Sequence, residues 1–273
     1  MRIAMNTGTL VGRYPIEEAM HLCKAAGFDS VDIAMNVLTQ PGWEGDQCYE
    51  QAVKIRRLSE ELDLPVLQTH AGGDKAKSAK VTALLGCPVM VIHPRIILPH
   101  VGYEDQNFVA NMEFLATFAP LAEENNIKIA VENMFKWDLK REVINYSTCS
   151  TTAEFCRYME GLHQRFGDLF GACVDVGHLA LVGTDVGETI RALGDDLLAL
   201  HVHDNDLHTD QHTIMGAGVI DFVQVSQALK DIRYQGAYAL EVGLHFPKDL
   251  LPTTVKYLAQ LCRYYADLAT HKE

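Results

Sequence analysis

Nine residues of this 273-residue chain have side chains that could together bind metal ions and move protons. They lie at or just after short apolar runs, which read PVLQTH, PVMVIHP, IKIAVEN, GACVDVGH, LLALHVHDND and GAYALEVG. The residues are His70, His93, Glu132, Asp175, His178, His201, Asp210, His212 and Glu241. Imidazoles and carboxylates are the usual ligands of divalent cations and the usual acids and bases of enzymes. Because such a residue recurs at the same end of successive runs, the sequence predicts one mouth where these side chains converge.

The most specific set within this group is Glu132, Asp175, His201 and Glu241. Three carboxylates and one imidazole suit Mn²⁺, Mg²⁺, Co²⁺ or Zn²⁺ and leave room for substrate oxygens. Without a cation, three clustered carboxylates would repel one another and raise their pKa values, so a bound divalent ion is expected. His203 has the same strand parity as His201, so either could be the ligand from this run, and we favour His201.

Helical patterns alternate with the apolar runs along the whole chain. Pro15 suits a first helical turn and Gly27 a helix end, whereas Pro120 is expected to kink or break a long helix. The segment after IKIAVEN is expected to be a polar loop. The predicted helices cover about 15–26, 46–62, 75–85, 104–125, 152–162, 186–193, 222–232 and 250–268.

Eight strand-helix units result when RIAMN and SVDIAM are counted as the first two strands. Near-continuous apolar strands joined by helices indicate a parallel sheet covered on its outer face. Eight units in a chain of this length predict a (β/α)₈ TIM barrel that forms a single domain over residues 1–273, with a doubly wound sheet as the alternative. In such a barrel the active site lies at the C-terminal ends of the strands, which is where the nine residues fall.

The amino-acid composition argues against nucleic acid and membranes as binding partners. The formal net charge is −13, from 36 acidic and 23 basic residues, so the chain lacks the basic excess that attracts proteins to nucleic acid. Seven scattered cysteines without a CxxC pair are typical of reduced thiols. No apolar run reaches the ~18 residues of a membrane span. We therefore expect a soluble, cytoplasmic protein with no membrane partner.

At this point the chain resembles a known family. The segments VENM, VDVGH, LHVHDND, TIMGAGVIDF and ALEVG, with the DxH of Asp210 to His212, are similar to the xylose isomerase-like TIM-barrel superfamily. That superfamily includes sugar isomerases, sugar epimerases and endonuclease IV. Resemblance to its ketose 3-epimerases implies one metal held by Glu132, Asp175, His201 and Glu241, with the two glutamates exchanging the proton on either side of a substrate carbon.

Resemblance to endonuclease IV implies a larger set with three zinc ions. His70 and His93 would join Glu132 at one ion, the set of four just named would hold a second, and a third would lie at His178, Asp210 and His212. Two features favour a sugar substrate over abasic DNA. Only 23 positions separate His70 from His93, which leaves little loop for gripping DNA, and the total charge is acidic.

The expected function is therefore a divalent-metal-dependent isomerase or epimerase of a small sugar, sugar phosphate or related polyol. Glu132 and Glu241 would act as base and acid through a metal-stabilised enediolate, and His178 would orient a substrate oxygen. The alternatives are a zinc-dependent phosphodiesterase of the endonuclease IV type and a catalytically silent binding barrel. Arg95, Lys136 and Arg141 are candidates for contacting a substrate phosphate or are simply solvated. Homo-oligomerisation is left open.

Overall fold

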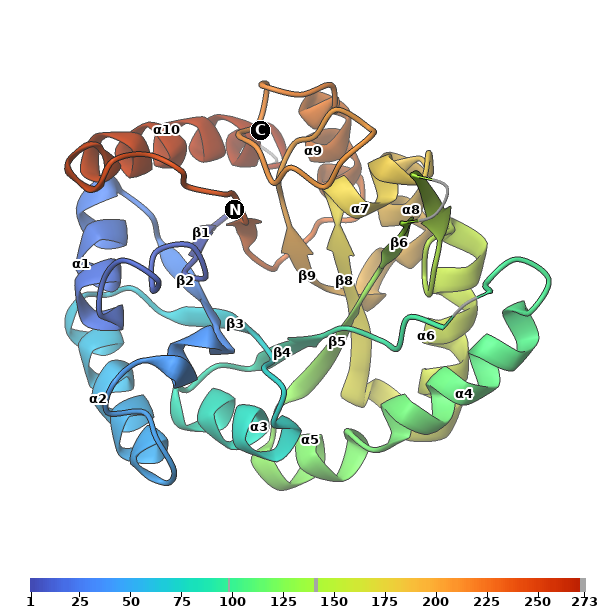
Figure 1. Cartoon of the computed structure of the whole chain (residues 1–273), viewed down its shortest axis with the longest axis horizontal. Helices are drawn as coiled ribbons and strands as arrows, with labels where there is room; N and C mark the ends of the chain where they lie inside the picture. The colour runs from blue at the N-terminus through green and yellow to red at the C-terminus, as the bar shows by residue number, and fades with distance from the viewer. Residues whose placement is uncertain (98, 140–141, 271–273) are drawn as a thin grey trace.

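A computed structural model describes residues 1–97, 99–139 and 142–270 of the chain. Eight parallel strands surround a common axis, and helices cover their outer side (Figure 1). The strands follow one another around the barrel in the order β10, β1, β2, β3, β4, β5, β8, β9. Their bounds are β1 Ile3–Asn6, β2 Ser30–Ala34, β3 Val66–His70, β4 Val89–Ile92, β5 Lys128–Glu132, β8 Phe170–Asp175, β9 Leu197–His201 and β10 Tyr238–Leu240.

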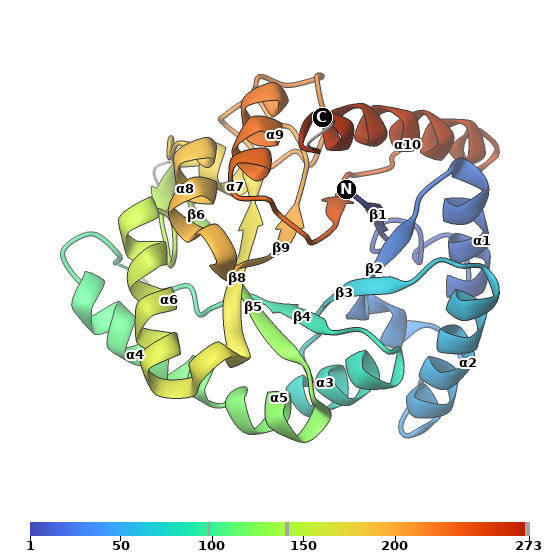
Figure 2. The ribbon, with the colours of Figure 1, turned by 180° about the vertical axis from the view of Figure 1, so that it is seen from behind.

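The seam between β9 and β10 is closed by a parallel bridge that pairs Val202 with Leu240. Val202 N donates to Ala239 O at 2.8 Å, and Glu241 N donates to Val202 O at 2.9 Å. The view from behind shows the same ring of strands with the helices outside it (Figure 2). The predicted (β/α)₈ barrel is thus confirmed, and the doubly wound alternative is wrong.

Helices follow the strands nearly where the sequence predicts them. Gly27 ends α1 with a left-handed φ of 100°, and the predicted long helix is two helices, since α4 ends at Ala116 and α5 begins at Ala119 with Pro120 in its first turn. The α-helices are α1 Ile16–Ala26, α2 Gln47–Glu61, α3 Lys75–Leu84, α4 Glu104–Ala116, α5 Ala119–Asn125, α6 Thr152–Phe166, α7 Val176–Leu181, α8 Val186–Leu193, α9 Phe222–Asp231 and α10 Leu251–Leu268. Short 3₁₀ turns cover η1 Met35–Thr39, η2 Gly167–Leu169, η3 Gly194–Asp196 and η4 Lys248–Leu250.

The strands divide their side chains between two layers. Outward residues such as Ile129, Val174 and Leu240 belong to the large core between strands and helices. Inward residues are small, and they form separate buried clusters of Val91, Ala130, Cys173 and Ala199 and of Ala4, Ala237 and Ala239. Because side chains alternate along a strand, the residue two positions after each small inward residue also points into the barrel. The inward layer above Ala130, Cys173, Ala199 and Ala239 is therefore Glu132, Asp175, His201 and Glu241.

One segment differs from its prediction. The polar loop expected after β5 contains a two-stranded antiparallel hairpin, β6 Phe135–Asp138 and β7 Val143–Tyr146. The alternation of aromatic with polar residues in FKWD, and the β-branched and aromatic residues of VINY, are the signals that were missed. No helix in residues 1–97, 99–139 and 142–270 is long and apolar enough to span a bilayer.

Candidate metal centre

The ends of β5, β8, β9 and β10 bring together the four residues that the sequence singled out. One potential ligand atom from each of Glu132, Asp175, His201 and Glu241 lies within 4.8 Å of the others. The first three are almost completely buried, and the Glu241 side chain is 19% exposed. The sequence left open whether His201 or His203 belongs to this group, and the structure places His201 in it. Glu241 is the member through which solvent reaches the group.

The contacts within this group fit a cation. His201 Nδ1 lies 3.4 Å from Glu132 Oε1 and 3.2 Å from Glu241 Oε2. Glu132 Oε2 is buried and makes no aligned hydrogen bond. Three carboxylates with one imidazole match the donor set that divalent ions take. The unsatisfied buried oxygen of Glu132 is a free acceptor for such an ion.

Protonated imidazoles balance these carboxylates when no cation is bound. Burial by itself would raise the pKa of Glu132, but the neighbouring His201 and His93 imidazoles hold that pKa well below its usual range. Burial is likewise outweighed at Glu241, where His201 and His70 lower the pKa of the carboxyl. In return, and despite its burial, the pKa of His201 is raised well above its usual value by Cys173 and by the carboxylates of Glu241 and Glu132. A divalent ion would replace these protons as the positive charge in the site.

A second group lies on the β3 and β4 side of Glu132. His70 Nε2 and His93 Nε2 are 2.8 Å apart, and they lie 3.5 and 3.2 Å from Glu132 Oε2. Both rings thus point a nitrogen at the same oxygen that lacks an aligned hydrogen bond. His93 is the more open of the two, with its side chain 47% exposed. The grouping agrees with the arrangement implied by the endonuclease IV resemblance.

A third group forms where α7 and the loop after β9 meet. His178 Nδ1 lies 3.0 Å from Asn133 O, and His212 Nδ1 lies 2.9 Å from Glu241 O, so these carbonyls accept the Nδ1 protons. The Nε2 atoms of both rings then face Asp210 Oδ2, at 3.6 and 3.2 Å. Burial would lower the pKa of both rings, but nearby carboxylates, Asp210 among them, raise the pKa of His178 to about 10 and that of His212 to about 9.

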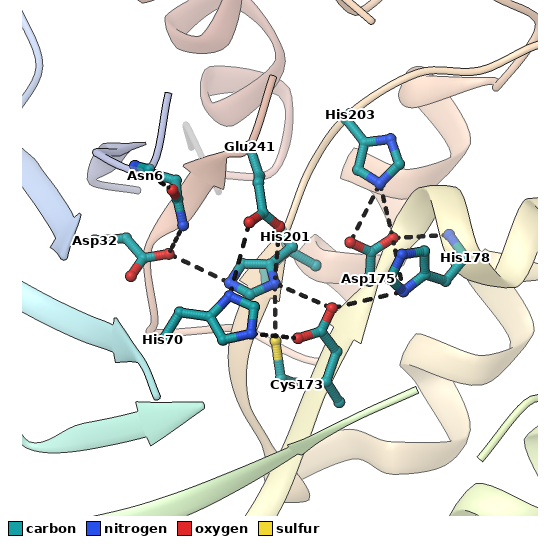
Figure 3. A network of polar contacts seen from close by, with 12 residues as sticks. Asn6, Asp32, His70, Cys173, Asp175, His178, His201, His203 and Glu241 are labelled. Atoms are coloured by element: carbon teal, nitrogen blue, oxygen red, sulfur yellow. Dashed lines mark hydrogen bonds and ion pairs between the residues drawn. The ribbon is translucent and has the colours of Figure 1, made fainter. Parts of the chain in front are cut away.

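His203 also belongs to this third group, and the sequence analysis did not predict its membership. Its ring stacks on that of His212 with centroids 3.8 Å apart, and its Nε2 lies 3.0 and 3.2 Å from the two Asp175 oxygens. His203 therefore links the third group to the four-residue group (Figure 3). Its spacing of two from His201 was the available signal, since it places both rings on the same side of the chain.

The loop that carries Asp210 and His212 is held by a buried carboxylate. Asp204 accepts backbone hydrogen bonds from Gly216, Gly218 and Ile220 at 2.8 to 3.1 Å. A Cβ at Gly218 would lie 2.2 Å from Asn205 O and 2.4 Å from Asp204 Oδ1, so only glycine fits there. The GAG of TIMGAGVIDF is thus a backbone turn that wraps around the Asp204 carboxylate.

An open cleft of about 720 Å³ adjoins the three groups on the side of β1, β2 and β3. The polar side chains that line it are mostly uncharged, and they include Asn6, Thr9, Asn36, Thr39 and Gln211. His70, His212 and Glu241 form its border with the metal centre. Among the described residues that line the cleft, none is a lysine or arginine.

The candidates for phosphate contact do not gather at this cleft. The Arg95 guanidinium lies over the Phe114 ring, 4.8 Å from its centroid, and Lys136 is not among the residues that line the cleft. Arg141 lies outside the described residues. Phe135 from β6 instead packs on His178, with ring centroids 5.0 Å apart, so the unpredicted hairpin covers one side of the third group.

Comparison with known proteins identifies the family to which this barrel belongs. Residues 20–261 match the family model described as xylose isomerase-like TIM barrel, so the chain belongs to that family. It is 27% identical over 243 residues to the D-psicose 3-epimerase of Enterocloster bolteae, with 81% of this chain and 75% of that protein covered.

Two further likenesses show the range of these relatives. An uncharacterized protein of Methanocaldococcus jannaschii is 29% identical over 161 residues, and the chain spans about half of that relative's length, 51%, with 58% of its own. A crystal structure of IOLI protein with a binding zinc atom has a TM-score of 0.73 at 16% identity, with 98% of each chain covered. The second likeness shows the shared fold.

Proposed function

We propose that this chain is a divalent-metal-dependent isomerase or epimerase that acts on a small sugar or related polyol. The observation that carries the proposal is the position of Glu132 and Glu241, two carboxylates grouped with His201 and Asp175 at the edge of a mostly uncharged polar cleft. The similarity to a D-psicose 3-epimerase supports the same reaction class.

The chain's own residues supply binding and proton transfer. Glu132, Asp175, His201 and Glu241 would hold Mn²⁺, Mg²⁺, Co²⁺ or Zn²⁺, which would supply the positive charge that stabilises an enediolate. One of the two glutamates removes the proton from the substrate carbon, and the other returns a proton from the opposite side. His178, whose Nδ1 donates to Asn133 O and whose Nε2 faces Asp210, would orient a substrate oxygen.

The lining of the cleft supports a carbohydrate without a phosphate group. Amide and hydroxyl side chains such as Asn36, Thr39 and Gln211 can both donate to and accept from sugar hydroxyls. Asp210 and Glu241 also line the cleft, and their carboxylates would repel a substrate phosphate. A ketose or polyol is therefore the substrate class that we favour.

A zinc-dependent phosphodiesterase is the second candidate. One observation favours it: two further groups of possible ligands lie beside the central four. One contains His70 and His93, and the other contains His178, Asp210 and His212. The acidic net charge of −13 weighs against a DNA substrate.

The deciding experiment measures metal content and two activities on the same preparation. Elemental analysis counts the ions per chain, deuterium incorporation from solvent is followed in a panel of ketoses, and cleavage is assayed on abasic-site DNA. We expect deuterium exchange that is abolished by a chelator and restored by one equivalent of a divalent ion. Efficient strand cleavage with three zinc ions per chain, and no exchange in any ketose, would overturn the proposal.

A further inference from the structure

A further carboxylate, outside the group of four, lies behind the candidate metal centre and inside the barrel. Asp32, in the middle of β2, is completely buried, and its Oδ2 lies 3.3 Å from His201 Nε2, the ring nitrogen that faces away from the candidate ligands (Figure 3). The same oxygen accepts hydrogen bonds from Asn6 Nδ2 at 2.8 Å and Gln68 Nε2 at 3.2 Å. The Gln68 amide also reaches Leu200 O at 3.4 Å, so this polar layer crosses the barrel from β1, β2 and β3 to β9.

The charge of Asp32 has no ordinary partner. Asn6 and Gln68 are neutral amides, and in residues 1–97, 99–139 and 142–270 no lysine or arginine forms an ion pair with this carboxylate. Asp32 Oδ1 and His201 Nε2 are both buried without an aligned hydrogen bond, although Nε2 lies within ion-pair distance of Oδ2. A buried carboxylate in this setting costs folding free energy unless it interacts with a positively charged or strongly polarised group. The imidazole of His201 is that group.

We propose that Asp32 is a positioning residue that fixes His201 as a metal ligand through Nδ1. A carboxylate beside Nε2 keeps the proton on that nitrogen and fixes the plane of the ring. The Nδ1 lone pair is then directed at the space that Glu132 Oε1 and Glu241 Oε2 also face, at 3.4 and 3.2 Å from Nδ1. A carboxylate that accepts the second ring proton also makes the imidazole a stronger donor to a cation. The inference rests on the proposed metal-dependent function, and it adds a residue that contacts neither metal nor substrate.

Asp32→Asn tests this role, because the amide keeps the size of the side chain and removes its charge. We expect Mn²⁺ affinity, measured by calorimetry on the metal-free protein, to fall by about 10- to 100-fold, the usual effect of losing a group that orients a ligand. The Asp175→Asn variant identifies which binding event belongs to the four-residue group. Thermal unfolding of the metal-free Asp32→Asn variant is expected at a lower temperature than that of wild type, since removing one partner of a buried ion pair leaves the other uncompensated.

A matched control separates orientation of His201 from general charge. Asp29 lies one residue before the start of the same strand, where it accepts from Ile3 N and pairs with Arg263 at the other end of the barrel. Asp29→Asn removes the same charge and should leave Mn²⁺ affinity within about twofold of wild type, because a charge this far from the ion is screened. Equal losses of affinity in both variants, or none in Asp32→Asn, would show that Asp32 does not act through His201.

A second measurement uses the unaltered protein, so it does not depend on a variant that folds. Nitrogen-15 spectra of histidine-labelled, zinc-loaded protein distinguish a ligated ring nitrogen from a protonated one. We expect His201 to show a ligated Nδ1 and a protonated Nε2, and ligation through Nε2 would overturn the inference. Neither readout requires sugar turnover. Absence of ketose exchange would therefore count against the proposed function while these results still decide the role of Asp32.

Discussion

Two hollows of similar volume lie at opposite ends of the barrel, and they use charge in opposite ways. The hollow at the N-terminal ends of the strands has about 740 Å³ and is lined by Arg2, Lys24, Asp29, Asp63 and Arg233. The cleft at the C-terminal ends has about 720 Å³ and adjoins the metal centre. Size therefore does not tell them apart, and the difference lies in how their charged groups are placed.

At the N-terminal end, four charged groups form two ion pairs that remain in contact with water. Lys24 Nζ lies 3.9 Å from Asp63 Oδ2, and Arg263 pairs with Asp29, with each of the latter side chains about one third exposed. At the C-terminal end, Glu132 and Asp175 are fully buried, and their nearest partners are histidines. Buried carboxylates lower stability unless a counter-charge is present, and here the histidines supply it, or the divalent ion that we propose. Changes at the two ends should accordingly affect different properties.

The largest effect is expected from the two glutamates at the C-terminal end. Glu132→Gln or Glu241→Gln keeps the size of the side chain but removes the oxygen that accepts a proton, so deuterium exchange at the substrate carbon should fall by roughly 10²- to 10⁴-fold. Metal content should fall less than in the matching alanine variants, because the amide oxygen still binds a cation. Undiminished exchange in both Gln variants would rule out the two-glutamate mechanism.

The histidines outside the four-residue group should have a smaller effect. Under the proposed function, His93→Ala or His212→Ala should change substrate affinity, by roughly tenfold or less, and keep the central ion, since neither residue belongs to that group. Elemental analysis and Michaelis constants for the active ketose measure both properties. A folded His93→Ala protein that has lost its metal and all activity would show that the flanking histidines are part of the catalytic centre.

Sequence patterns predicted the fold and the grouping of the candidate ligands because both follow from periodicity. The small inward residues Ala130, Cys173 and Ala199 stand two positions before Glu132, Asp175 and His201, so strand alternation alone places these three ligands at one mouth. Helix ends could also be predicted from the sequence, as at Gly27 and Pro120.

Contacts across the barrel could not be predicted from the sequence in this way. Asp32 lies in the apolar run SVDIA, and a lone carboxylate in a buried strand is a signal that something must balance it. The sequence does not say that this partner is His201, because the two residues meet only when the barrel closes. His203 was foreseen as an alternative ligand, but its stacking on His212 depends on how the loop after β9 folds back. Side chains that meet through loop conformation or across the axis have no fixed spacing in sequence.

A pH-dependent effect on stability is expected from a pair away from both hollows. His100 Nε2 lies 3.4 Å from Glu154 Oε1, and this contact raises the pKa of His100, with Glu104 adding to the effect and burial opposing it. A raised folded-state pKa stabilises the protein fully below the unfolded value near 6.5, and the stabilisation is lost as the pH rises through the folded value. His100→Gln should therefore lower the free energy of unfolding by about 1 kcal/mol at pH 6 and by less at pH 9. Urea unfolding of metal-free wild type and variant at both pH values tests this, and a difference that does not depend on pH would contradict it.

The smallest effect is expected at the N-terminal hollow. Asp29→Asn removes one member of a partly exposed ion pair and should lower the free energy of unfolding by only about 0–1 kcal/mol, the usual range for such pairs. Added salt should reduce the difference between variant and wild type, because exposed charges are screened. Ketose exchange and metal content should not change. Asp32→Asn, three residues along the chain, should differ from it, with metal binding weakened by about 10- to 100-fold and a stability loss that added salt does not reduce, because the Asp32–His201 pair is buried. If urea unfolding and calorimetry instead gave the same pattern for both variants, charge would be serving one purpose at both ends of the barrel, and the contrast between the two hollows would not hold.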